Sequence, residues 1–281
     1  MDKLLIVDGM NLLFQMFYGM PARIVDHTGK PIQGTLGFVG ALLKIIHMTE
    51  PTHVAVVFDG ECKNSRKELD GDYKANRPDY SQMPEVETPF SQLPDVYAAL
   101  DVLGICHAET IDCEADDWIA GYARNLGDML EIVIASQDSD FFQLITDQVT
   151  VLRYRGKCSA FCDPWYIEQK LGIRPEQYAD FKSMVGDHAD NIRGAERIGI
   201  KTAAELLRQF GSLQAVIQGA DQISKPSIRH SVQVNAERLE KNYRLIYLSG
   251  AGELPFSLED MKYCLLGMTT GEVLRAIGLW R

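Results

Sequence analysis

The sequence predicts an α/β fold with a mainly parallel central sheet flanked by helices, and three observations carry this prediction. Short β-branched or apolar runs at residues 4–7, 54–58 and 132–135 are typical of buried strands. Apolar residues recur at helical spacing in the intervening sequence and just before the third run. Helices are expected at residues 36–47, 90–103 and 115–126. This alternation is typical of a parallel sheet with helices on both faces.

The chain changes character after about residue 175. Strand signals fade there, and short amphipathic helices with Gly-containing turns follow. We therefore expect an α/β core over residues 1–180 and a helical subdomain over residues 181–281. Residues 60–84 are polar and charged and contain Gly and Pro, which indicates a surface excursion from the core.

Composition narrows the class of protein. The six cysteines lack the paired spacing of a zinc site, so we interpret them as reduced thiols. The first residues enter a strand pattern directly, and no apolar run reaches the ~18 residues of a membrane span. We expect a cytoplasmic monomer without a membrane partner. A net charge of −11 counts against DNA binding unless divalent cations offset the acids or basic residues cluster locally.

Acidic residues follow each of the three predicted strands. Asp8 follows the first, Asp59 the second, and Asp138 and Asp140 the third. In open parallel sheets the ligand site lies beyond the carboxyl ends of the strands, so these acids would meet in one crevice. One such Asp is usually a turn or helix-cap residue, but the same placement after three strands favours a shared site.

Two further acidic groups extend this set. Glu114, Asp116 and Asp117 lie at the start of a predicted helix. The helix macrodipole accounts for one or two acids at this position, but three acids repel one another unless cations separate them. Asp187 and Asp190 would share a face in a helical turn, although a helix cap is an alternative. Oxygen ligands favour Mg²⁺, with Mn²⁺ as a substitute, over zinc. Two such ions about 3.5–4 Å apart suit phosphodiester hydrolysis.

In sequence order, the motifs at residues 7–9, 57–59, 114–117, 138–140 and 186–191 resemble the 5′ nuclease (flap endonuclease) family. That family includes the 5′ to 3′ exonuclease domain of bacterial DNA polymerase I. The resemblance extends to at least residue 210 and implies a PIN-like nuclease core, a helical arch at about residues 60–90 and a C-terminal helix-hairpin-helix subdomain. No polymerase domain follows, so we expect a free-standing member that acts in DNA replication or repair.

The resemblance also implies two metal sites built from carboxylates. The first would be surrounded by Asp8, Asp59, Glu114, Asp116 and Asp117. The second would be completed by Asp138, Asp140, Asp187 and Asp190. Asp138 is placed to serve both sites and is expected to be essential for catalysis.

Basic and aromatic residues alternate in the excursion after Asp59, as suits phosphates and unstacked bases: Lys63, Arg66, Lys67, Tyr73, Lys74, Arg77 and Tyr80. A solvated loop is the alternative, because acids dilute the charge. Residues 73–78 match the basic element of the family's arch. The resemblance therefore assigns Lys74 and Arg77 to stabilising the scissile phosphate and Tyr73 to contacting DNA.

Residues 194–204 resemble the family's helix-hairpin-helix element, which grips duplex DNA and often holds K⁺ through backbone carbonyls. Gly199 permits close backbone approach, and Lys201 opens a helix beside amides that can face an anion. A simple helix turn would suit such a Gly equally well. Arg197 stands where relatives commonly carry Gly. This difference counts against a K⁺ site, but it would allow Arg197 itself to contact a phosphate.

The expected function is two-metal-ion hydrolysis of DNA at 5′ flaps, 5′ overhangs or junctions. One alternative is a catalytically weak nucleic-acid-binding module with structural metal ions; intact acids at both expected sites count against it. Another is a phosphohydrolase for small phosphoesters, in which the basic excursion and the hairpin would have no purpose. Residues 7–11 lack the glycine fingerprint of a dinucleotide-binding fold.

Overall fold

A six-stranded sheet forms the centre of the computed structural model, which describes residues 2–60, 65–250 and 253–281. In sheet order the strands are β3 (Cys106–Glu109), β2 (His53–Phe58), β1 (Lys3–Asp8), β4 (Glu131–Ala135), β5 (Val149–Arg153) and β6 (Ala160–Cys162). The first five are parallel and β6 is antiparallel. The three predicted strands are confirmed, and as β2, β1 and β4 they are direct neighbours.

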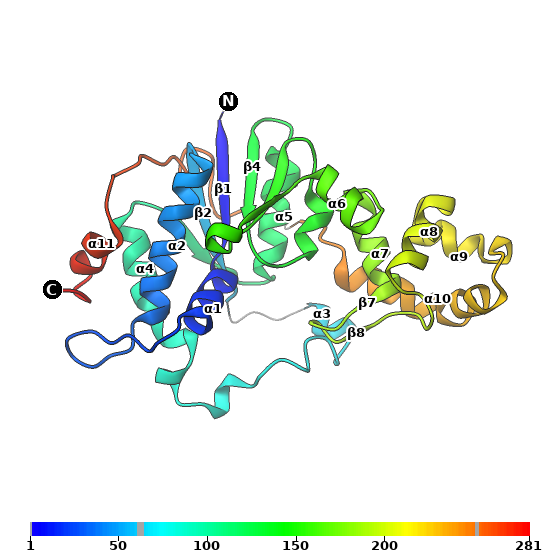
Figure 1. Ribbon diagram of the computed structural model, residues 1–281, viewed down its shortest axis with the longest axis horizontal. Coiled ribbons are helices and arrows are strands. Elements are labelled where there is room, and N and C mark those ends of the chain that lie inside the picture. The colour runs from blue at the N-terminus through cyan, green and yellow to red at the C-terminus, as the bar shows by residue number, and fades with distance from the viewer. Residues whose placement is uncertain (1, 61–64, 251–252) are drawn as a thin grey trace.

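The two faces of the sheet carry separate hydrophobic cores because successive strand side chains point to opposite sides. In β1, Leu5 and Val7 pack on one face, and Leu4 and Ile6 pack on the other. The first face is covered by α1 (Gly9–Gly19), α2 (Gln33–Thr49), α4 (Leu93–Val102) and α11 (Thr270–Ala276). The second is covered by α5 (Ala115–Leu126) and α6 (Pro164–Leu171). Helices therefore flank the sheet on both sides, as predicted (Figure 1).

A helical subdomain extends from the β6 side of the sheet (Figure 1). It contains α7 (Tyr178–Val185), α8 (Ile200–Phe210), α9 (Leu213–Gln218) and α10 (Pro226–Ile246). A small hairpin of β7 (Gly186–Asp187) and β8 (Ile192–Arg193) follows α7. The expectation that Asp187 and Asp190 share a helical turn is therefore wrong: Asp187 ends β7, and Asp190 lies in the hairpin turn.

The last part of the chain returns to the α/β core. The backbone N–H of Val54 donates to Met261 O, and the N–H of Tyr263 donates to Thr52 O, so residues 261–263 run beside β2. Helix α11 then packs against α2 and α4. The division of the chain at residues 180 and 181 stays a prediction.

The excursion after β2 carries one short α-helix, α3 (Ser65–Leu69), in its described part, and Lys63 lies outside the described residues. Three 3₁₀ turns follow: η1 (Tyr80–Gln82), η2 (Glu85–Glu87) and η3 (Pro89–Gln92). In Figure 1 the segment starts beside the hairpin and returns to α4, past the end of α1. Within the described ranges, no helix has the length and apolar character needed to cross a bilayer.

Candidate active site

Asp8 is the last residue of β1, where the chain passes directly into α1. A side chain at Gly9 would collide with the ring of Phe58, so this immediate start of the helix against β2 requires glycine. One carboxylate oxygen of Asp8, Oδ1, accepts a 3.0 Å bond from the N–H of Asn11, and Oδ2 accepts a 2.8 Å bond from Ser136 Oγ. Asp8 is thus both the N-cap of α1 and a link to the end of β4.

Three more acids surround Asp8 from different elements. Asp59, directly after β2, accepts a 2.8 Å hydrogen bond from the N–H of Ala115, which ties the end of β2 to the start of α5. Asp138 lies in the turn after β4, where its N–H donates to Ser136 Oγ at 3.0 Å. In the part of the chain that the structure describes, the carboxylate of Asp116 has no hydrogen-bond donor. It is therefore available to a cation.

The electrostatics of this group match a cation site. Burial, and next the repulsion from Asp59, raise the pKa of Asp8 to about 7. Burial, and next the charge of Asp138, raise the pKa of Asp116 well above its usual range, and burial raises that of Asp59. Crowded, desolvated carboxylates are costly to ionise unless positive charge lies between them. A donor set of carboxylate oxygens fits Mg²⁺ or Mn²⁺.

A second group of carboxylates lies beside the first. Oxygen atoms of Asp140, Asp187 and Asp190 all lie within 4.8 Å of one another. The hairpin makes this possible, because Gly186 has a φ of +89° and a side chain there would collide with the backbone of Gly194. Asp138 joins the two groups through its carboxylate, which accepts a 2.8 Å bond from the N–H of Asp140.

The ammonium group of Lys182, on α7, lies inside this second group. It donates to Asp140 and forms a 2.6 Å ion pair with Asp187. Burial raises the pKa of Asp140 to about 7 despite the opposing charge of Lys182. For Asp187 burial acts in the same direction, but Lys182 and the backbone N–H groups of Ala189 and Asp190 together outweigh burial, and the pKa is lowered. Lys182 thus supplies part of the positive charge that the second group requires.

The basic residues predicted after Asp59 lie against both acidic groups. Lys74 Nζ forms a 2.6 Å ion pair with Glu114, and Arg77 forms a 2.7 Å ion pair with Asp190. Tyr73 OH lies 3.3 Å from Glu114 Oε2 and 3.4 Å from Asp190 Oδ2. Burial lowers the pKa of Lys74, but the charges of Glu114, Asp116 and Asp190 together outweigh burial and the net shift is upward, so the side chain is charged at neutral pH. The excursion therefore brings two cations to the carboxylates.

The sequence places Arg66 in a basic stretch suited to phosphates, but the structure buries its side chain. Its side chain is only 9% exposed, and it pairs with Glu114 at 2.8 Å and with Asp117 at 2.7 Å. Its Nε also donates to Leu245 O, at the end of α10, at 3.0 Å. The expectation of an exposed phosphate contact is wrong for Arg66, because burial and two carboxylates hold it inside the protein.

The three residues expected to contact duplex DNA lie in one turn, between the β7–β8 hairpin and the start of α8. Arg197 is exposed and has a φ of +65°, Gly199 leaves open space where a side chain would stand, and Lys201 is exposed in the first turn of α8. Helix α8 has neither an acid in that turn nor a side-chain cap. Its first N–H groups are thus open to an anion, which the helix dipole would favour.

Several residues around the carboxylates escaped the sequence analysis: Asn11, Ser136, Gln137 and Lys182. The serine and the asparagine carry a local signal, because each lies two or three residues from an acid that it contacts. The lysine carries none toward Asp140, which it meets across 42 positions of sequence.

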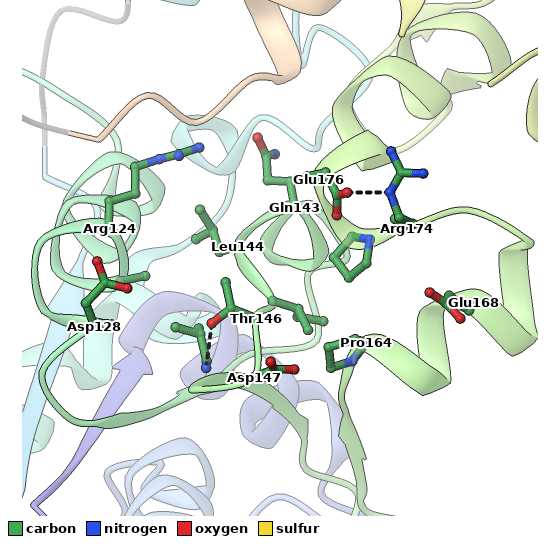
Figure 2. Close-up of a pocket in the computed structure, with 15 residues that line it drawn as sticks. Arg124, Asp128, Gln143, Leu144, Thr146, Asp147, Pro164, Glu168, Arg174 and Glu176 are labelled. Carbon is green, nitrogen blue, oxygen red and sulfur yellow. Dashed lines mark hydrogen bonds and ion pairs between the residues drawn. The ribbon is translucent and has the colours of Figure 1, made fainter. Parts of the chain in front are cut away.

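A cavity of about 620 Å³ lies at the other end of α5 (Figure 2). Its lining includes Arg124 and Arg174, but both have partners: Arg124 donates to Leu248 O, and Arg174 pairs with Glu176. Helix α5 starts beside the carboxylates and runs 12 residues, about 18 Å, to this cavity. The cavity is therefore separate from the acidic site.

Comparison with known proteins gives two family matches that together span most of the chain. The model of the 5′-3′ exonuclease N-terminal resolvase-like domain matches residues 3–172, and that of the 5′-3′ exonuclease C-terminal SAM fold matches residues 173–266. The thermostable DNA polymerase I of Thermus aquaticus is 33% identical over 244 residues, which cover 86% of this chain and 28% of the polymerase. The chain thus spans less than a third of the length of that relative.

Solved structures of T5 proteins superimpose on most of this chain. A T5 protein co-crystallised with metal ions superimposes with a TM-score of 0.73 at 25% identity, over 88% of this chain and 89% of that chain. The bacteriophage T5 flap endonuclease in a complex with DNA and metal ions superimposes with a TM-score of 0.69, also at 25% identity and with the same coverage of both chains.

Proposed function

Because this chain belongs to the 5′-3′ exonuclease family, we propose that it is a structure-specific 5′ nuclease that hydrolyses DNA at 5′ flaps, 5′ overhangs and junctions. One observation carries the proposal. Carboxylates from the ends of β1, β2 and β4, the start of α5 and the β7–β8 hairpin converge beside Lys74 and Arg77. Oxygen ligands next to fixed cations suit a phosphodiester, whose charge increases during hydrolysis.

We propose Mg²⁺ as the natural cofactor, with Mn²⁺ as a substitute, at two positions. Asp8, Asp59 and Asp116 would hold the first ion, Asp140, Asp187 and Asp190 the second, and Asp138 would contact both. When bound, the ions supply a Lewis acid for the attacking water and for the leaving oxygen. The carboxylate of Asp116, which accepts no hydrogen bond from the described residues, and the 4.8 Å grouping of Asp140 with the two hairpin acids support this assignment.

Glu114 and Asp117 would take a different part in the first site. Both carboxylates face Arg66, and Glu114 also faces Lys74. We propose that they act chiefly by orienting these cations and the start of α5, with any contact to the ion made through water, which Mg²⁺ usually retains.

The substrate would be held by two separate basic surfaces. Lys74 and Arg77 would meet the scissile phosphate, and the turn containing Arg197, Gly199 and Lys201 would grip the duplex backbone. Tyr73 is only 4% exposed, and its ring lies under Lys74 Nζ, so it would act on DNA through Lys74. A K⁺ ion at the carbonyls of that turn is compatible with the left-handed backbone of Arg197, which is the conformation a glycine would supply. Replacing K⁺ by Na⁺ at constant ionic strength tests it, since loss of that ion would weaken duplex binding.

The alternative functions predict different outcomes in one assay. A labelled 5′-flap duplex is incubated with wild type, with Asp138→Ala and with wild type in EDTA. The nuclease proposal expects cutting by the wild type alone, and binding of the flap by Asp138→Ala close to wild type. A binding module with structural ions would bind the flap without cutting it, and a small-phosphoester hydrolase would leave it intact but cleave p-nitrophenyl phosphate.

A further inference from the structure

Gln137 lies immediately before Asp138, and hydrogen bonds engage all four of its polar groups. Its backbone N–H donates to Asn11 Oδ1 at 2.9 Å, and its carbonyl accepts from Arg153 Nη2 at 3.0 Å. In the side chain, Nε2 donates to Tyr154 O at 2.8 Å, and Oε1 accepts from Arg155 Nε at 3.1 Å. A half-buried residue in a loop in which each polar group makes a hydrogen bond is held in a single orientation.

The partners of Gln137 belong to two structural elements that border the carboxylates. Asn11 is in the first turn of α1 and also donates its N–H to Asp8, at 3.0 Å. Tyr154 and Arg155 follow β5, whose last residue is Arg153. The Tyr154 carbonyl accepts a second 2.8 Å bond from Gln15 of α1, so α1, the end of β5 and the turn after β4 meet at Gln137.

This arrangement connects the acid at the end of β1 with the acid after β4. One path runs from Asp8 through Asn11 to the backbone of Gln137. A second runs from Asp8 through the hydroxyl of Ser136 to the N–H of Asp138. Hydrogen bonds hold both the N–H and the carbonyl of Gln137, and both partners, Asn11 and Arg153, lie outside the turn. These contacts therefore help to set the orientation of the Asp138 residue that follows.

From this geometry we propose that Gln137 is a positioning residue: it fixes Asp138 relative to Asp8 and thereby sets the affinity of the site for its divalent ion. The inference rests on the proposed function, because it assumes that Asp138 is a ligand. Ligand positions must hold to within about 0.5 Å for ion binding to be efficient. Groups that orient metal ligands affect the metal although they never touch it.

The chain offers a matched control. Gln177, the last residue of a 3₁₀ turn (Pro175–Gln177), is also a glutamine whose side chain holds separate elements together. Its Nε2 donates to Gly211 O at 2.8 Å, and its Oε1 accepts from the N–H of Arg174 at 3.1 Å. These contacts join the start of α7 to the end of α8 and involve none of the carboxylates. Gln177→Met removes a comparable set of side-chain bonds without disturbing Asp138.

The test compares full-length wild type, Gln137→Met and Gln177→Met by Mn²⁺ titration, with free Mn²⁺ measured by electron paramagnetic resonance, and by thermal melting. We expect Gln137→Met to bind Mn²⁺ about 10- to 100-fold more weakly, the usual effect of losing an orienting group. Gln177→Met should lower the Tm and leave Mn²⁺ affinity unchanged. Flap cleavage by Gln137→Met should recover as Mn²⁺ is raised, because the ligands themselves remain.

A second variant covers the case in which Gln137→Met fails to fold. Arg155 is exposed, so Arg155→Ala removes one partner of Gln137 without opening the core. It should weaken Mn²⁺ binding by about two- to tenfold, the effect of one hydrogen bond.

The outcomes separate the two proposals. Wild-type Mn²⁺ affinity in both Gln137→Met and Arg155→Ala, with or without a lower Tm, would overturn the positioning role and leave the nuclease proposal intact. A wild type that takes up no Mn²⁺ and cuts no flap would overturn both.

Discussion

The guanidinium of Arg66 donates two hydrogen bonds to the carboxylate of Asp117, through Nη1 at 2.9 Å and Nη2 at 2.7 Å. The two residues are 51 positions apart. The same side chain reaches Glu114 and the carbonyl of Leu245, so one arginine joins the excursion after β2 to the start of α5 and the end of α10. This contact connects the core, the arch-like excursion and the helical subdomain at one buried point.

The first prediction concerns stability. Arg66→Met should lower the free energy of unfolding by about 3–5 kcal/mol, because it leaves the largely buried carboxylate of Asp117 without its cation and removes one of the two cations that face Glu114. Urea unfolding followed by circular dichroism measures the change. The control is Lys262→Ala, which breaks the exposed pair with Glu259 and should cost less than about 1 kcal/mol. Equal stability of the two variants would show that the Arg66 contacts contribute little.

The second prediction concerns Lys74. Lys74→Ala should slow flap cleavage by about 10²- to 10³-fold, because a positioned cation acts on charge that develops in the transition state. The loss of flap affinity, measured by fluorescence anisotropy in Ca²⁺, should be smaller. Lys44→Ala is the control, since Lys44 is exposed on α2 and forms no ion pair with the described residues. A large affinity loss with a normal cleavage rate would instead make Lys74 a tether.

The third prediction concerns pH in the metal-free protein. Burial raises the pKa of Asp8 and of Asp140 to about 7 in the folded state, from about 3.8. The folded state therefore binds more protons than the unfolded state between these values, and stability should fall as pH rises from about 4 to about 7. A loss of 1 kcal/mol corresponds to a Tm lower by about 2–4 °C.

Divalent ions should reverse this loss, because they stabilise the ionised carboxylates. Differential scanning fluorimetry at pH 5 and pH 8, with and without Mg²⁺, measures both effects. Mg²⁺ should raise the Tm more at pH 8 than at pH 5. An equal increase at both values would indicate that Mg²⁺ binds elsewhere.

The fourth prediction concerns Arg197. Its φ of +65° is a conformation that glycine adopts without strain, so Arg197→Gly should stabilise the protein by about 1 kcal/mol. The same change should weaken duplex binding and reduce the salt slope by about 1, as expected for one lost phosphate contact. Lys44→Ala, an exposed cation on α2, should leave duplex binding unchanged. Unaltered binding by Arg197→Gly would remove Arg197 from the interface.

Much of the core follows from local sequence patterns. The apolar runs at β1, β2 and β4 are short and uninterrupted, and each ends next to an acid, so both the strands and the direction of their carboxyl ends can be read directly. Helix α5 was expected at residues 115–126 and is observed there. The sequence of a few neighbouring residues is enough to predict these elements, and the tertiary structure keeps them as predicted.

The hairpin shows where that approach fails. A spacing of three between Asp187 and Asp190 suits a helical turn, but Gly186 at positive φ ends α7 and packs directly against Gly194. The two acids still meet, although by a different backbone. Spacing alone does not distinguish a helical turn from a tight hairpin, since both bring such residues together.

The sequence by itself determined the parallel sheet and the acids at its carboxyl edge, which are the basis for proposing a divalent ion. Only the tertiary structure decided which cation faces which acid, Arg66 with Asp117 and Lys182 with Asp140. It also decided that the backbone of Gln137 lies between Asn11 and Arg153. The reason is physical. Strand periodicity is a short-range property of the chain, whereas a buried charge takes whichever partner the packing of distant elements brings within hydrogen-bond distance.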